Sequence, residues 1–137
     1  MGKPYRPKDH YFQKAKAEGF RARSAFKLEE LAKRFQLLRP GLRVLLEVNV
    51  AGEHGKAGIA PGEIDEYIAR SPFPVVGLMT MPPLAREPEE NRRWFAALRE
   101  LAVQHQLEEL SMGTSQDYLV AVQEGATIVR IGTKLYS

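Results

Sequence analysis

The 137-residue chain contains no cysteine, which excludes disulfides and thiolate chemistry and favours a cytoplasmic protein. No apolar run approaches the roughly 20 residues that span a bilayer, so we expect no membrane partner. The N-terminal sequence lacks the apolar segment and the small-residue cleavage pattern of a secretory signal. Histidine is scarce as well, and His10, His54 and His105 are too widely spaced to predict a metal site.

Positive charge is concentrated at the N-terminal end of the chain. Residues 1–43 hold 12 Lys/Arg against 4 Asp/Glu, a net charge of +8, whereas residues 44–137 hold 8 against 13, a net charge of −5. This division indicates either a basic arm for nucleic acid on an acidic body or two segments of different origin. Hydrophobic residues make up 44% of the sequence, which is enough for one domain with its own core.

Hydrophobic periodicity predicts two amphipathic helices followed by alternating strands and helices. The first helix covers residues 9–18, and the second begins at Ser24 with an apolar face of Leu28, Leu31, Ala32 and Phe35. Strands are predicted over residues 42–50, 73–81, 107–112 and 126–131. Helices are predicted between them over residues 61–70, from residue 88 onward and over residues 115–124. Because helices connect the strands, the pattern indicates a parallel sheet.

The first predicted strand has two unequal faces. One face is apolar along residues 42, 44, 46, 48 and 50, whereas the other carries Arg43, Leu45, Glu47 and Asn49. A strand covered by helices on both sides is apolar on both faces. The polar face therefore indicates a strand whose second side lines a cavity or the interior of a barrel.

Two short loops predict a phosphate site, because ligands of parallel α/β proteins bind at the carboxyl ends of the strands. The sequence "SMGTSQD" supplies Ser111, Gly113 and Ser115, and "RIGTKLYS" supplies Gly132 and Thr133. Their hydroxyl and backbone N–H groups are donors suited to one phosphate. The alternative is structural, with Gly113 only making a turn and Ser115 only capping the helix that follows.

Two cations near these loops have alternative interpretations. Arg130, at the end of the last strand, either pairs with a carboxylate such as Glu47 or contacts a ligand. Lys56 ends the sequence "GEHGK", which lacks the spacing of a phosphate-binding P-loop, and we expect a solvated lysine there. No nucleophile with its base and orienting carboxylate is visible in the sequence.

The segment "RARSAFKLEELAKRF" offers a second kind of site. Its basic residues surround two phenylalanines and suit contacts with RNA phosphates; they are Arg21, Arg23, Lys27, Lys33 and Arg34. The alternative is a surface helix whose phenylalanines belong to the core.

Residues 9–45, with "RSAFKL" followed by "RPGLRVL", resemble the start of the heat-shock-type 23S ribosomal RNA 2′-O-methyltransferase family. The resemblance implies two helices, the first strand of a Rossmann-like domain and a catalytic lysine that falls on Lys27. It also implies a glycine-rich S-adenosylmethionine loop directly after "RVL", where this chain reads "LEVNVAGEHG". Because that loop and the family's other catalytic residues have no counterparts, we expect Lys27 to be vestigial and neither S-adenosylmethionine binding nor methyl transfer.

Residues 43–137 resemble the C-terminal part of the pyridoxal-phosphate homeostasis protein family, whose fold is the alanine-racemase-like β/α barrel. The matching motifs, in order, are "LLEVNVAGEHGKAGI", "GLMTMPP", "LSMGTSQD" and "TIVRIGTKLYS". The resemblance implies phosphate binding by Ser111 or Ser115 with Gly132 and Thr133, and it places Arg130 near the pyridine nitrogen. The family's covalent cofactor lysine lies on an early barrel strand that has no counterpart here.

The two resemblances meet at "RVL", which predicts a recombinant or designed chimera with no physiological catalytic function. We expect residues 1–42 and 43–137 to form one composite unit, whose chain ends beyond its last barrel strand because the other half of the site was replaced. At most, weak binding of phosphate or pyridoxal phosphate remains. RNA binding through the basic helices is the alternative, and a substitute cofactor lysine at Lys56 or Lys134 is a third hypothesis.

The predicted fold is an α/β protein in which two N-terminal helices precede a four-stranded parallel β/α half-barrel-like sheet. A Rossmann-like strand order is the alternative, because the joint lies in the first strand. A half-barrel leaves its sheet edges and its interior face uncovered. The helices cover that face within one chain, or two chains form a homodimer through the open edges, which we favour.

Overall fold

The computed structural model describes residue 17 and residues 24–136, and of the side chains those of residue 17 and residues 28–136. Contacts divide the chain between Gly41 and Leu42 into two compact units, each of which is described by itself. The first predicted helix lies outside the described residues apart from Ala17, which is helical. The prediction that residues 1–42 and 43–137 form one composite unit stays a prediction.

The second predicted helix is present in the first unit as α2 (Ser24–Phe35). The helix ends where Gln36 adopts a positive φ of 50° and the Leu37 N–H donates to the Ala32 carbonyl at 3.1 Å. A left-handed residue after the last helical turn redirects the chain and satisfies a terminal carbonyl.

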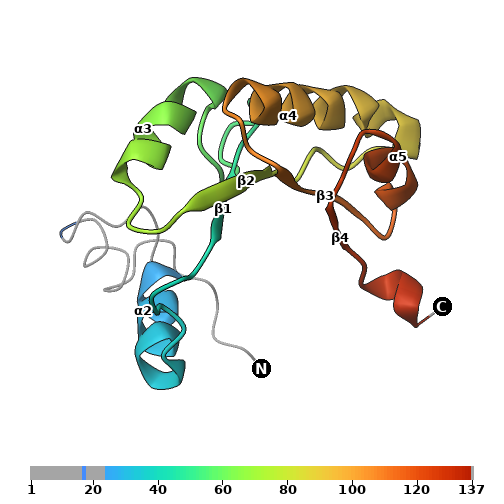
Figure 1. Ribbon diagram of the computed structural model, residues 1–137. Helices are drawn as coiled ribbons and strands as arrows, with labels where there is room; N and C mark the ends of the chain where they lie inside the picture. The colour runs from blue at the N-terminus through green and yellow to red at the C-terminus, as the bar shows by residue number, and fades with distance from the viewer. Residues whose placement is uncertain (1–16, 18–23, 137) are drawn as a thin grey trace. The chain divides into compact units, whose positions relative to one another are not determined.

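The second unit is a parallel sheet whose four strands follow one another in space in the order of the sequence (Figure 1). The strands are β1 (Val44–Glu47), β2 (Val75–Met79), β3 (Glu109–Thr114) and β4 (Ile128–Arg130). Helices α3 (Ile64–Arg70), α4 (Arg92–Gln104) and α5 (Tyr118–Gln123) connect them. The half-barrel-like order is confirmed. The Rossmann-like alternative is wrong, because its strand order reverses at the first strand, whereas here each crossover places the next strand beyond the last.

Proline starts two of the connecting segments, as predicted from its fixed φ and missing N–H. Pro61 opens the 3₁₀ turn η1 (Pro61–Glu63) before α3, and Pro88 opens η2 (Pro88–Asn91) before α4. The Glu63 carboxylate accepts the Ala60 N–H at 2.7 Å and so closes the first of these turns. No described helix is long and apolar enough to cross a membrane.

The core lies between the sheet and its three helices. Its largest fully buried side chains come from both layers, with Leu78 and Met112 from the sheet and Ile64, Phe95 and Leu98 from the helices. Figure 1 shows α3, α4 and α5 on the same side of the strands. The polar side of β1 is therefore the one that these helices leave uncovered, in agreement with the two unequal faces of its sequence.

The two edges of the sheet differ. β4 is the last strand in the order, whereas β1 receives a parallel bridge from its own loop. Ile59 donates its N–H to the Glu47 carbonyl at 2.8 Å and accepts the Asn49 N–H at 2.9 Å. The carboxyl end of β1 is thus already paired on its outer side.

Candidate functional site

The predicted phosphate residues lie at the carboxyl ends of two neighbouring strands. Ser111 belongs to β3, Ser115 follows that strand, and Gly132 and Thr133 follow β4. β3 and β4 are paired in parallel, with Thr114 opposite Arg130. Because parallel neighbours end at the same edge of the sheet, the two loops lie side by side.

Ser115 joins the two loops. Its Oγ accepts the Gly132 N–H at 3.0 Å and the Lys134 N–H at 3.4 Å. The N–H of Thr133, between those two groups, donates to no acceptor in the described part of the chain. The prediction that Ser115 caps a helix is wrong, because α5 begins three residues later, after Asp117. Its hydroxyl instead holds the turn η3 (Thr133–Leu135) against the end of β3.

Gly113 is required by packing as well as by conformation. Its φ is +90°, and a Cβ added there would lie 2.6 Å from the Ala121 Cβ and 3.0 Å from the Tyr118 Cα. Real Cβ atoms do not approach neighbours so closely, so only glycine lets α5 lie against the end of β3. Gly113 thereby places the loop that carries Ser115.

Arg130, the last residue of β4, donates hydrogen bonds to β3 and to the residues that follow β2. Its Nη1 donates to the Ser111 carbonyl at 3.1 Å and to the Ser111 Oγ at 2.7 Å. Its Nη2 donates to the Thr80 carbonyl at 2.8 Å and to the Met81 Sδ at 2.9 Å, both just beyond β2. Four of the five guanidinium N–H groups are therefore engaged within the protein.

The interpretation in which Arg130 pairs with a carboxylate does not describe these contacts. Burial lowers the pKa of the guanidinium from its ordinary value, while the charges of Glu47 and Asp117 act in the opposite direction. Glu47 therefore influences Arg130 through its field, and the direct partners among the described residues are carbonyls, a hydroxyl and a thioether. The contact with a ligand stays a prediction.

Sequence reasoning missed a buried pair beneath the loop. Asp117 is 6% exposed, and its Oδ1 accepts the Thr114 N–H at 2.7 Å and the Thr114 hydroxyl at 3.1 Å. Its Oδ2 accepts the Asn91 side-chain amide at 2.8 Å, and Asn91 is 5% exposed. The pair ties the loop after β3 to the start of α4. The sequence does show Asn91 just before α4 and Asp117 just before α5, which are positions that favour such side chains. It does not show that the two residues pair, because that depends on the fold.

A family model described as "Alanine racemase, N-terminal domain" matches residues 20–137. The chain belongs to this family. The pyridoxal phosphate homeostasis protein of Aquifex aeolicus (strain VF5) is 50% identical to it over 103 residues, which are 68% of this chain and 45% of that relative. A solved structure of PipY from Synechococcus elongatus PCC7942 without PLP matches at 31% identity with a TM-score of 0.64. Another, with PLP bound, matches at 30% with a TM-score of 0.59, and each match covers 82% of this chain and 56% of PipY.

A second group of relatives shares a shorter segment. Ribosomal RNA large subunit methyltransferase E of Myxococcus xanthus (strain DK1622) is 67% identical over 51 residues, which are 37% of this chain and 24% of that relative. Both resemblances predicted from the sequence are therefore confirmed. The chain spans about half the length of its curated relatives in the alanine racemase N-terminal domain family, and less of the methyltransferases.

The residues predicted to contact RNA are only partly described. Arg21 and Arg23 lie outside the described residues, and Lys27 is placed on α2 without a described side chain. Lys33 donates to Glu29 at 2.7 Å, and this hydrogen bond raises the pKa of the lysine. Arg34 stacks on its neighbouring phenylalanine ring, 5.3 Å from the centroid. The structure neither gathers these five cations into one site nor separates them.

The two lysines considered as substitutes for the missing cofactor lysine are both engaged. Lys56 pairs with Glu53 at 2.5 Å and donates to the Pro82 carbonyl at 3.4 Å, and its side chain stays exposed, as the prediction of a solvated lysine requires. The Lys134 ammonium lies 5.8 Å from the centroid of the Tyr118 ring. The described residues include no group of three His, Cys, Asp or Glu side chains that suits a metal.

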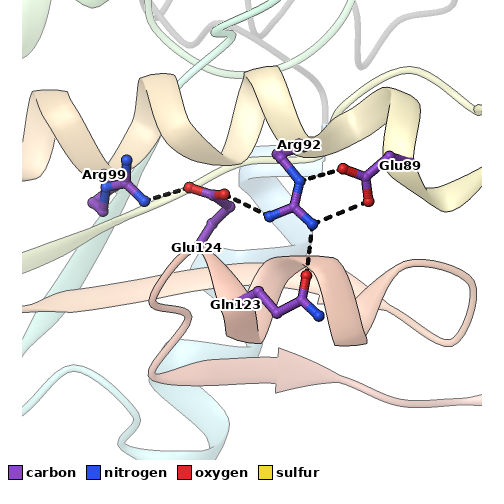
Figure 2. A network of polar contacts seen from close by, with 5 residues as sticks. All are labelled: Glu89, Arg92, Arg99, Gln123 and Glu124. Atoms are coloured by element: carbon purple, nitrogen blue, oxygen red, sulfur yellow. Dashed lines mark hydrogen bonds and ion pairs between the residues drawn. The ribbon is translucent and has the colours of Figure 1, made fainter.

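An ionic network outside the candidate site holds α4 and α5 together (Figure 2). Glu124 accepts from Arg92 at 2.7 Å and also from Arg99, and its side chain is 11% exposed. Arg92 donates in addition to Gln123 at 2.6 Å and to Glu89. The hydrogen bonds from Arg92 are the main cause of the lowered pKa of both Glu124 and Glu89.

Proposed function

We propose that this chain binds phosphate groups weakly and without catalysis, at the site formed by Ser111, Ser115 and Thr133. One observation carries the proposal: the Ser115 hydroxyl draws the loops after β3 and β4 together, with the Thr133 N–H left between its two donors. The relation to PipY, whose structure is solved with PLP bound, supports pyridoxal phosphate as a carrier of that phosphate group.

The donors fit a phosphate but leave the rest of pyridoxal phosphate unsupported. Three hydrogen bonds contribute about 0.5–1.5 kcal/mol each, roughly 1.5–4.5 kcal/mol in total. A dissociation constant of 1 mM corresponds to about 4 kcal/mol, so we expect millimolar affinity or weaker. The cofactor itself supplies an aldehyde that a neutral lysine amine captures, whereas Lys56 in this chain is held by the carboxylate of Glu53.

The test is a titration of the ¹⁵N-labelled chain, followed by amide chemical shifts, with inorganic phosphate, pyridoxal phosphate and pyridoxal. We expect phosphate and pyridoxal phosphate to shift the amides of residues 111–115 and 132–134 at millimolar concentration, and pyridoxal to leave them unchanged. Ser115→Ala weakens this response, whereas the control Ser71→Ala, whose hydroxyl bonds the Phe73 backbone elsewhere, does not. Shifts elsewhere, or equal shifts with pyridoxal, would refute the phosphate site.

A separate measurement tests whether a lysine of this chain captures the cofactor covalently, as the catalytic hypothesis requires. Reduction of a mixture of the chain and pyridoxal phosphate with borohydride traps any covalent link to a lysine. We expect no adduct at Lys56 or Lys134 by mass spectrometry at stoichiometric cofactor. An adduct that disappears in either Lys56→Ala or Lys134→Ala would establish the third hypothesis and refute this part of the proposal.

We also propose that the chain is a recombinant or designed chimera of two parents. The similarity to methyltransferase E over 51 residues and the match to pyridoxal phosphate homeostasis proteins over 103 residues support this origin, as does the change in net charge near residue 43. The expected result is no binding of S-adenosylmethionine and no methylation of ribosomal RNA. Either activity above background would refute the loss of the methyltransferase site.

We propose that the chain forms a homodimer through the open edge of the sheet at β4. Three exposed apolar side chains on α5 and β4 support it: Leu119, Val122 and Ile128. Size-exclusion chromatography with light scattering should give a dimer, with amide-exchange protection in β4 that falls on dilution. A monomer at all concentrations, with β4 equally protected, would refute it.

A further inference from the structure

A cavity of about 320 Å³ lies between the segment that leads from β2 to α4 and the loop that follows β3, apart from the residues of the proposed phosphate site. It is lined by Ala85, Arg86, Pro88, Asn91, Gln116 and Asp117. Asn91 and Asp117, which are 5% and 6% exposed, form its buried floor. Arg86 and Gln116 are exposed and form its mouth. The volume is that of about ten water molecules, which admits a small organic molecule.

The Asn91 side chain has an acceptor that the fold leaves unused. Its Nδ2 donates to the Asp117 Oδ2 at 2.8 Å, and because a carboxylate accepts hydrogen bonds, this contact fixes the amide with its Oδ1 turned away from Asp117. No described residue donates to that Oδ1, and the described residues do not enclose it. Because the rest of Asn91 is buried, the oxygen is reached from the cavity that the residue lines. Polar atoms of buried residues rarely lack a partner, so this one indicates a bound molecule.

The floor and the mouth of the cavity carry opposite charges. At the floor, the Asp117 Oδ1 accepts two hydrogen bonds from Thr114, and the Oδ2 accepts one from Asn91. An oxygen of this kind accepts two, so one position remains on the Asp117 Oδ2 and two remain on the Asn91 Oδ1. At the mouth, the Arg86 guanidinium has no hydrogen bond or ion pair with any described residue. A group with three N–H donors fits the floor, and a carboxylate fits the mouth.

We propose that this cavity binds a small α-amino acid as a zwitterion, whose ammonium group donates to Asn91 and Asp117 and whose carboxylate accepts from Arg86. An amine without a carboxylate leaves Arg86 unused. A carboxylic acid without an amine leaves the acceptors at the floor unpaired and brings a second negative charge toward Asp117. Ala85 and Pro88 give the side chain of the ligand an apolar wall, and the volume limits that side chain to a short one. The cavity shares no residue with the proposed phosphate site, so neither proposal depends on the other.

The experiment titrates the ¹⁵N-labelled chain with alanine and with two analogues of the same size, near pH 6. Lactate keeps the carboxylate but carries a hydroxyl in place of the ammonium group. Alaninamide keeps the ammonium group, which stays charged at this pH, but has no carboxylate. We expect alanine to shift the side-chain amide signals of Asn91 and Gln116 and the backbone amides next to them at millimolar concentration. Each analogue should bind at least about tenfold more weakly, because one charge-assisted contact is missing.

Variants locate the site. Arg86→Gln should weaken alanine binding at least about tenfold, whereas the control Arg70→Gln, which removes an exposed arginine from the end of α3, should not. Ser115→Ala should leave alanine binding unchanged, which separates this cavity from the proposed phosphate site. Equal affinity for alanine and either analogue would overturn the proposal, because the cavity would then recognise one charge rather than two. Absence of any shift at tens of millimolar alanine would overturn it as well, and water alone would then fill the cavity.

Discussion

Replacing Gly113 with alanine tests how the end of β3 is built. Two effects act together there, since the positive φ of 90° is unfavourable for a side chain and the new Cβ meets Ala121 at 2.6 Å. The first costs about 1–2 kcal/mol, and overpacking of this kind costs about 1–3 kcal/mol. The expected loss in the free energy of unfolding is therefore roughly 2–5 kcal/mol. This is a large part of the 5–15 kcal/mol typical of a domain.

The chain supplies controls that separate the two effects. Gly55 has a positive φ of 81° with nothing within 4 Å of an added Cβ, so Gly55→Ala carries the conformational cost alone. Gly77 has no positive φ, but its Cβ would lie 2.0 Å from the Glu109 carbonyl oxygen, so Gly77→Ala carries the steric cost alone. Gly62 has neither, and Gly62→Ala is expected to be neutral or to stabilise by about 0.4–1 kcal/mol.

Urea unfolding followed by circular dichroism measures all four variants through the midpoint and the m-value. The expected order of stability is Gly62→Ala first, then Gly55→Ala, with Gly77→Ala and Gly113→Ala lowest. Equal loss in Gly113→Ala and Gly55→Ala would show that α5 moves aside without cost. The packing argument for Gly113 would then be wrong.

Three further predictions concern charges and hydrogen bonds. The lowered pKa of Glu124 means that its ionised carboxylate stabilises the fold above pH 4.5, the ordinary pKa, and that this stabilisation is lost as the pH falls through the lowered pKa. Glu124→Gln should therefore reduce the loss of unfolding free energy on acidification. At pH 7 the variant should be less stable by about 1.5–3 kcal/mol. Asn91→Asp should destabilise the protein, because it sets a second carboxylate against Asp117. The double variant Asn91→Asp/Asp117→Asn should recover stability, because every hydrogen bond of the pair can form again. Thermal unfolding of the two variants measures both effects. If the basic segment binds RNA, its affinity should fall steeply with salt in filter binding and be lost in Arg21→Ala/Arg23→Ala, whereas salt-independent binding would contradict phosphate contacts.

Periodicity and proline placement were enough to predict the elements of the second unit. Pro61 and Pro88 open the segments that were expected to start there, and the apolar runs became strands in sequence order. The ends of the strands were less predictable. β3 was expected to stop at residue 112 but continues through Thr114, because pairing with β4 extends to Arg130. Such pairing depends on a neighbour more than ten residues away, which local pattern does not contain.

The residues of the candidate site were chosen from two loops, and their role in binding phosphate stays a prediction; their hydrogen-bond partners could not be read from the sequence. Ser115 was expected to cap a helix, and it instead accepts N–H groups from residues 17 and 19 positions later. Arg130 was expected to meet a carboxylate or a ligand, and it reaches the carbonyl of Thr80, 50 positions earlier. Donors and acceptors are satisfied by whatever the fold brings near, so side-chain chemistry alone does not predict which groups pair.

The bridge between Ile59 and the end of β1 makes the two edges of the sheet unequal for pairing with another copy of the chain. A sheet with two equivalent free edges can add copies at both ends and grow without limit into fibrils. Here the chain's own loop occupies the outer side of β1 at Glu47 and Asn49, so a copy that approaches this edge finds only the first part of the strand. A growing stack would stop at that end. The homodimer proposed above would therefore form at the β4 edge of the sheet, and its assembly would end with two copies.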